Sequence, residues 1–128
     1  MRSQHFPPSK SFSCGLDATL RVLAGKWKPL ILYGLYQRGA VRYGELKRAV
    51  QGVSEKVLIQ QLKELQSDGI VSREDFKEIP PRVEYALSPR GQTLAQALIP
   101  LCDWGNENME EVARVLAERT GWHKNDLG

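Results

Sequence analysis

The most constraining feature of this sequence is a pair of short helical patterns, joined by a tight turn and followed at once by two strand patterns, within residues 43–87. The first helix is predicted over 43–49 and the turn over 51–53. The second helix is predicted from the capping residue Ser54 to Ser67, where Asp68-Gly69 ends it with a residue that tolerates positive φ. Its apolar stripe, at spacings of four and three residues, consists of Leu58, Leu62 and Leu65.

Two strands are predicted directly after this helix, over 70–74 and 82–87, with a charged tip at 75–81 that ends in two prolines. A small edge strand is predicted at 40–42. A helix-turn-helix followed by a hairpin is the winged-helix arrangement. In that arrangement the second helix fits the major groove of double-stranded DNA and the hairpin lies along the neighbouring backbone.

Further helices flank this unit. One is predicted from Leu16 to about Lys26 and another over 29–37. A long helical pattern opens at Ser88-Pro89 and continues to about Arg119, and Pro100 is expected to kink or break it. We interpret residues 1–13 as a flexible N-terminal arm and 121–128 as a C-terminal tail.

Charge is spread unevenly along the 128 residues. The net charge is +3, but residues 1–50 hold nine Lys and Arg against two Asp and Glu. Such asymmetry fits a basic face for phosphates and a separate acidic end. No run approaches the roughly 20 apolar residues of a membrane span, and the N-terminus lacks a secretory h-region. We therefore expect a cytoplasmic protein with no membrane partner.

The sequence does not indicate an enzyme or a metal site. Its two cysteines form no CxxC or Cys/His cluster, and His5 and His123 lie at opposite ends of the chain. No glycine-rich phosphate loop is present, and the carboxylates are scattered over predicted surfaces. We expect no catalytic residue, no metal and no cofactor.

The predicted second helix carries a polar face opposite its leucines. Lys binds guanine or phosphate, and Gln pairs with an adenine edge. Cations near the first helix and on the wing suit phosphate. The alternatives are an ordinary solvated surface, or a winged helix that binds protein. The candidate DNA-binding residues are Arg42, Lys47, Ser54, Lys56, Gln60, Lys63, Lys77 and Arg82, with Arg48 and Arg73 beside them.

Ordered motifs along the chain resemble one family. The chain is similar to the HxlR-type winged helix-turn-helix regulators, which are related to the MarR proteins, over about residues 13–106. The motifs that carry this resemblance are Cys14–Leu20, Gly25–Leu32, Tyr43–Leu46, Val57–Leu65, Asp68–Arg73, Pro80–Gly91 and Trp104-Gly105.

The resemblance implies a homodimer that binds a two-fold symmetric operator and regulates nearby genes, with repression the expected mode. The fold implied is α+β, mainly α: a winged helix-turn-helix domain over 14–120 with added N- and C-terminal dimerisation helices. The alternative is that the apolar stripe of the terminal helices folds back on the chain's own core. The expected interface residues are Leu16, Leu20, Leu98, Leu101, Trp104, Met109 and Val112, with Leu116 beyond them.

Relatives of this family use a cysteine at the start of the first helix to sense oxidants or electrophiles, and Cys14 matches that place. A helix N-terminus lowers a thiol pKa and so supplies a thiolate. The alternative is a small apolar residue buried at a dimer interface. Cys102 is interpreted as a packing residue near the interface, with a disulfide between Cys14 and Cys102 as the alternative. A small-molecule effector in a cleft beside the dimer helices is a further possibility.

Overall fold

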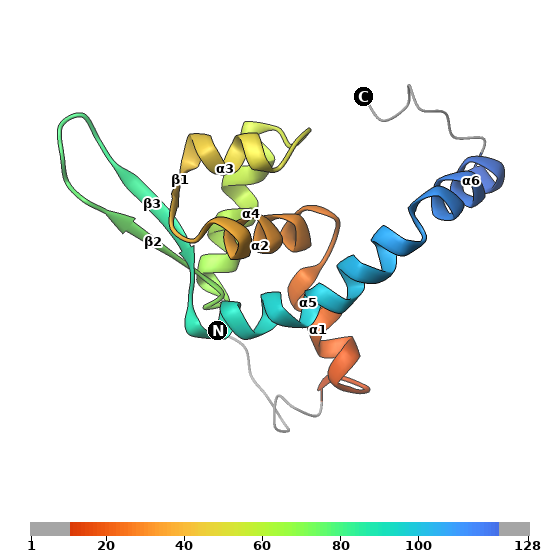
Figure 1. Cartoon of the computed structure of the whole chain (residues 1–128). Helices are drawn as coiled ribbons and strands as arrows, with labels where there is room; N and C mark the ends of the chain where they lie inside the picture. The colour runs from red at the N-terminus through yellow and green to blue at the C-terminus, as the bar shows by residue number, and fades with distance from the viewer. Residues whose placement is uncertain (1–10, 121–128) are drawn as a thin grey trace.

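The fold, seen in a computed structural model that describes residues 11–120, is a winged helix-turn-helix with additional helices at both ends (Figure 1). It is mainly helical with one small antiparallel sheet, as the sequence predicts. Among these residues, no helix combines the length and apolar character needed to cross a bilayer. The elements are α1 (Gly15–Leu23), α2 (Trp27–Arg38), β1 (Val41–Arg42), α3 (Tyr43–Ala49), α4 (Glu55–Ser67), β2 (Val71–Asp75), β3 (Val83–Leu87), α5 (Pro89–Glu107) and α6 (Met109–Thr120).

The core is built where α2, α3 and α4 meet. The predicted stripe of α4 points into it, and Leu58, Leu62 and Leu65 are each at most 1% exposed. They pack with the buried leucines and isoleucine of α2 and with Leu46 of α3. Burying each such side chain contributes about 1.5–3 kcal/mol, so this cluster fixes which way α4 faces.

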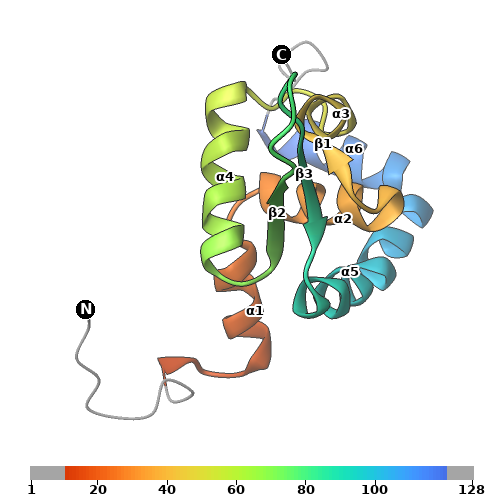
Figure 2. The same ribbon diagram turned by 90° about the vertical axis from the view of Figure 1, so that its left-hand side faces the viewer.

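The wing is a hairpin of β2 and β3 that projects beside α4 (Figure 2). The two strands pair in register from Val71↔Leu87 to Asp75↔Val83. The short strand β1 pairs with the other edge of β3, which gives the strand order β1-β3-β2. The wing is therefore anchored through its central strand to the segment that precedes α3.

Two boundaries differ from the sequence prediction. The first helix ends at Leu23 rather than near Lys26, because the chain turns at Ala24 and at Gly25, whose φ is +88°. The long C-terminal helix continues through Pro100, so the expected break does not occur there. Pro100 is exposed, where solvent can satisfy the carbonyl that loses its donor.

The interruption lies instead at Asn108, between α5 and α6. Its backbone φ is −120°, and both its amide N–H (3.1 Å) and its side-chain Nδ2 (2.8 Å) donate to the carbonyl of Trp104. These bonds satisfy the end of α5 and let α6 start again. Figure 1 shows α5 and α6 extending away from the winged-helix core, and no residue of 109–119 is buried.

The predicted flexible arm and C-terminal tail lie largely outside the residues that the structure describes. Residues 1–10 of the arm and all of 121–128 are outside the described residues. Within the described part, residues 11–13 precede the first helix as predicted.

The start of α5 is docked tightly onto the turn that ends α4. The Ser88 hydroxyl caps α5 by accepting from the amide N–H of Gly91 at 3.0 Å, and it donates to the carbonyl of Gly69 at 2.7 Å. A Cβ on Gly91 would lie 2.1 Å from the carbonyl oxygen of Ile70. Only glycine fits this joint between the wing and the long helix.

Gly91→Ala is accordingly expected to lower the free energy of unfolding by about 2 kcal/mol or more, because backbone rather than a flexible side chain has to move. Gly44→Ala is the matched control. It adds the same methyl at an exposed position of α3, in only ordinary contact with Arg48. Its free energy of unfolding should be unchanged or higher by up to about 1 kcal/mol. Denaturant unfolding of both variants measures the difference, and equal stabilities would contradict this account of the joint.

Candidate nucleic-acid interface

The outward face of α4 presents the polar residues predicted from its periodicity. Ser54 caps the helix, its hydroxyl accepting from the amide N–H of Val57 at 3.2 Å. Lys56, Gln60 and Lys63 are all exposed. Together with Ile59 they line a shallow hollow of about 360 Å³. The structure therefore brings this predicted group together on one solvent-facing surface, which we call the α4 face.

An ion pair between a buried lysine and a half-exposed glutamate, beside the α4 face, was not predicted from the sequence. Lys28 on α2 is only 5% exposed, and its Nζ lies 2.5 Å from Oε1 of Glu64 on α4. The ammonium of Lys28 holds the pKa of the Glu64 carboxyl below its usual range, and the amide of Gln60 adds to this effect. The available signal was Lys28 itself, a charge within a helix of otherwise apolar inward positions.

A groove of about 550 Å³ separates α4 from the wing. Lys63 lies on its helix side and the exposed Arg73 on its strand side. Tyr43 lines its floor, and its hydroxyl is buried without a hydrogen-bond partner. Burial raises the pKa of Tyr43, and the nearby Glu55 carboxylate raises it further. The Tyr43 hydroxyl therefore stays protonated to a higher pH than that of an ordinary tyrosine, because its pKa is raised.

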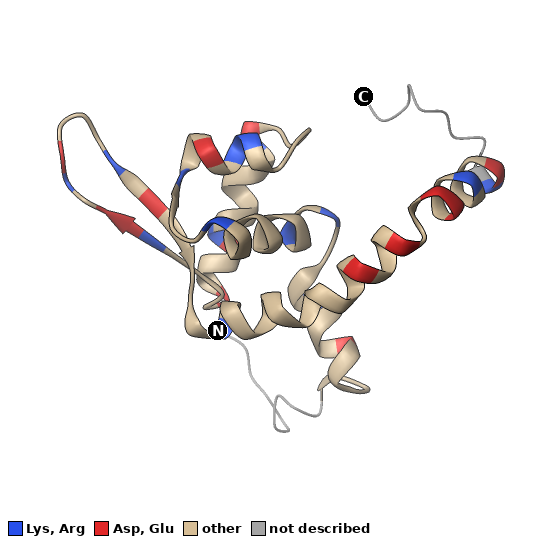
Figure 3. Ribbon diagram, in the orientation of Figure 1, with Lys and Arg blue, Asp and Glu red and all other residues tan. Residues whose placement is uncertain are grey.

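The cationic side chains predicted to contact phosphate near α3 differ in their exposure to solvent. Arg42 is exposed at the end of β1, directly before α3, and Arg48 is exposed on α3. Lys47 is half-buried, and its Nζ donates to the carbonyl of Val53 at 3.3 Å. Lys47 therefore ties α3 to the turn before α4. Figure 3 shows cations on α2 and α3, with one acidic residue among them on α3, whereas acidic residues outnumber cations along α5 and α6.

Arg82 of the wing is largely engaged inside the hairpin. Its guanidinium lies 3.8 Å over the ring of Phe76 and pairs with Glu78 at 3.3 Å and Glu84 at 3.8 Å. Lys77 sits exposed at the tip, in a left-handed backbone conformation with φ 57°. Of the two predicted wing cations, Lys77 is the one turned to solvent.

A second surface, the apolar face, lies on α1 and on the α5–α6 helices. Leu16, Leu20, Leu101, Trp104 and Met109 are between 57% and 67% exposed, while Leu98 and Val112 are half-buried. Leu98 packs against the chain's own core. A hollow of about 640 Å³ with an almost wholly apolar lining opens between α1, α2 and α5, and Leu30, which the sequence analysis did not include, also lines it.

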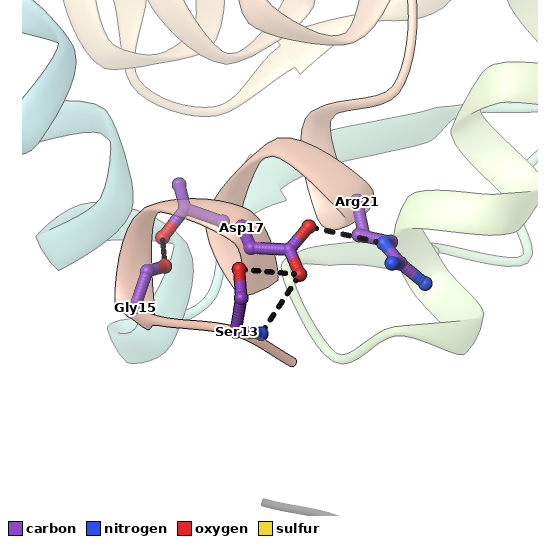
Figure 4. A network of polar contacts seen from close by, with 5 residues as sticks. Ser13, Gly15, Asp17 and Arg21 are labelled. Carbon is purple, nitrogen blue, oxygen red and sulfur yellow. Dashed lines mark hydrogen bonds and ion pairs between the residues drawn. The ribbon is translucent and has the colours of Figure 1, made fainter. Parts of the chain in front are cut away.

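Cys14 is the N-cap of α1 and is exposed. The backbone N–H of Asp17 lowers the pKa of its thiol, and the backbone of Leu16 and the Ser13 side chain contribute less. Asp17 itself is occupied, since its carboxylate accepts from the backbone of Ser13 at 3.0 Å and from Arg21 at 3.2 Å (Figure 4). The partner thiol considered in the sequence analysis, Cys102, is half-buried in the apolar hollow.

Within the described residues, Cys14 and Cys102 are both free thiols. The Sγ of Cys102 accepts from Asn106 at 3.8 Å, and it raises the pKa of the neighbouring Tyr33 hydroxyl. Cys14 is exposed in the single chain, so the alternative of burial at a dimer interface would require a second subunit to cover it.

Comparison with protein families places this architecture among known regulators. The model of the HxlR-like helix-turn-helix family matches residues 22–113. An uncharacterized HTH-type transcriptional regulator of Bacillus subtilis, YkvN, is 44% identical over 102 residues, which cover 80% of this chain and 86% of YkvN.

Solved structures agree with this match. A MarR-family regulator from Porphyromonas gingivalis W83 superposes with a TM-score of 0.70 at 37% identity, covering 84% of this chain and 98% of that one. The redox regulator HypR in its reduced form gives a TM-score of 0.72 at 35% identity, over 79% of this chain and 99% of that chain.

Proposed function

The chain belongs to the HxlR-like helix-turn-helix family, and from this we propose that it acts as a homodimer that binds a two-fold symmetric site in double-stranded DNA through α4. At the level of the family, it is a helix-turn-helix transcriptional regulator, and regulators of this kind are not enzymes. We further propose that it acts as a repressor and in the cytoplasm, and that residues 14–120 form one DNA-binding and dimerisation domain.

The observation that carries this proposal is the α4 face. Lys56, Gln60 and Lys63 are exposed along one side of a helix whose other side is locked in the core. An α-helix fits the major groove, where lysine and glutamine reach base edges and phosphates. Arg42 before α3 and Lys77 at the wing tip lie on flanking elements and are assigned to backbone contacts.

Lys63→Ala is expected to weaken binding to the selected DNA site and to reduce the salt dependence of binding by about one phosphate contact. Lys63 is exposed, so the melting transition and the dimer should not change. Arg119→Ala, which removes an exposed cation from α6, is the matched control and should bind as the unmodified protein does. Titrations at several salt concentrations measure both.

The same titrations separate the main rival, a winged helix that binds protein. If the protein binds another protein instead, its affinity for duplex DNA would be weak, and substitution of Lys56, Gln60 or Lys63 would not change that affinity. An unchanged affinity of Lys63→Ala would reject the assignment of α4 to the groove.

The homodimer is proposed from the apolar face. An isolated chain would expose Leu16, Leu101 and Trp104 to water beside a hollow of about 640 Å³. Contiguous exposed apolar surface of this kind marks an interaction site. A second copy supplies the same surface, so a two-fold axis through α1 and α5 would pair the faces and place two α4 helices on one duplex.

Leu101→Glu is expected to convert the dimer to monomers, because it places a charge where apolar side chains would be buried. Ile79→Glu is the matched control: Ile79 is 99% exposed at the wing tip, away from the apolar face. Light scattering after size exclusion measures the mass of each. A dimeric Leu101→Glu protein, or a monomeric unmodified one, would contradict this interface.

We also infer that Cys14 makes DNA binding responsive to oxidants or electrophiles. It is exposed at a helix N-terminus that lowers its pKa, and HypR, a redox regulator, is among the structural neighbours. With a peroxide, the sulfur would take up one oxygen to become a sulfenic acid, and water would leave. With an activated carbon–carbon double bond, the thiolate would form a sulfur–carbon bond as the π bond breaks, and the other carbon would take up a proton, so no group leaves.

The lowered pKa predicts a pH profile. Alkylation of Cys14 by iodoacetamide should begin at lower pH in the folded protein than in the same protein unfolded in urea, because the thiolate is present at lower pH. Mass spectrometry follows the modified peptide. Peroxide should change DNA affinity in the unmodified protein and in Cys102→Ser, but not in Cys14→Ser.

Coincident folded and urea profiles, or a peroxide response that survives in Cys14→Ser, would refute the role of this thiol. A surviving response would point instead to oxidation at Cys102, the other thiol of the described residues.

A further inference from the structure

The residue on the α4 face with the greatest power to discriminate bases is Gln60. Its amide carries one acceptor, Oε1, and two N–H donors. Adenine offers a donor and an acceptor in the major groove, whereas guanine offers two acceptors. A glutamine whose amide rotates freely can turn either its oxygen or its nitrogen to a given base atom, so the preference depends on what fixes the amide.

In this structure a carboxylate fixes it. The Nε2 group of Gln60 donates to Oε2 of Glu64 at 3.4 Å, one helical turn along α4. A carboxylate only accepts hydrogen bonds, so it selects the nitrogen of the amide and excludes the flipped orientation. Oε1 and the second N–H of Gln60 are then left for another partner.

Glu64 is fixed in turn from the protein interior. Its other oxygen, Oε1, is paired with the Nζ of Lys28, which comes from α2 and is 5% exposed. This pairing also matters for charge, because Glu64 is 44% exposed on a helix proposed to approach phosphates. The buried ammonium offsets the repulsion that a lone carboxylate would exert there.

We propose that Lys28 and Glu64 are positioning residues for DNA recognition, which hold the amide of Gln60 in one orientation and thereby make it prefer adenine to guanine. The inference rests on the proposed function, since it assigns α4 to the major groove. Held in this way, Oε1 of Gln60 accepts from adenine N6 and its free N–H donates to N7, whereas at guanine Oε1 would face another acceptor.

The test is a base-preference measurement with variants of all three residues. Selection from duplexes with randomised sites gives the unmodified protein's site, and Gln60→Ala identifies the base pair at which preference depends on Gln60. At that pair the unmodified protein should favour adenine over guanine by about 10-fold, as a good bidentate contact does.

Glu64→Gln is the decisive variant. It has nearly the same shape, but its amide both donates and accepts, so it tolerates either orientation of Gln60. The preference at that pair should fall to about 3-fold or less, well below that of a bidentate contact, while preferences elsewhere in the site remain. Lys28→Met, which leaves the Glu64 charge without its partner, should weaken binding to all duplexes alike and also relax the preference.

A double variant, Lys28→Met with Glu64→Gln, separates positioning from folding. It removes both charges together, so the thermal stability lost in Glu64→Gln, which leaves the buried ammonium of Lys28 without its carboxylate, should return, while the preference for adenine should not. If Glu64→Gln keeps the full preference at the Gln60-dependent pair, the inference is wrong although DNA binding stands. If the unmodified protein shows no duplex preference at all, the proposed function itself fails.

Discussion

The burial of one leucine stripe on α4 is the interaction on which the remaining architecture depends. Leu58, Leu62 and Leu65 are removed from solvent by α2 and α3. Because side chains on a helix follow its period, locking these positions leaves the opposite face outward with no freedom of rotation. The polar α4 face is therefore a consequence of the core and needs no binding partner to form. A preformed reading surface loses little conformational entropy when it binds.

The base of the wing and the start of α5 meet the C-terminal end of α4 at one joint. The turn after Ser67 feeds β2, and the same turn accepts the cap of α5 through Ser88 and the close approach of Gly91 to Ile70. A movement of α5 would thus be transmitted to the C-terminal end of α4 and to the base of the wing. This connection gives a physical route by which chemistry at α1, or a change in the packing of α1 against α5, could alter the spacing of two reading helices in a dimer.

The sequence predicts the features that have a local period or a local cap. The order of the elements, the stripe of α4, its Ser54 cap and the hairpin all follow from short-range patterns, and the structure confirms them. Contacts between distant side chains leave no such pattern. The pairing of Lys28 with Glu64 and the stacking of Arg82 on Phe76 depend on which rotamers meet in space. The expected break at Pro100 does not occur, because the penalty of a helical proline depends on solvent access, which a sequence does not give.

The charge distribution indicates that α4 and the wing would contribute differently to DNA binding. The acidic residues Glu74, Asp75, Glu78 and Glu84 outnumber the cations of the hairpin, and Arg82 is engaged with two of them. A hairpin of this composition gains little from phosphates, so Arg82 is better explained as a brace that stiffens the wing. On the α4 face, the carboxylate next to Gln60 is that of Glu64, and the ammonium of Lys28 offsets its charge. Affinity in this chain would therefore come from α4 and from the segment before α3, while the wing would limit how the duplex is seated.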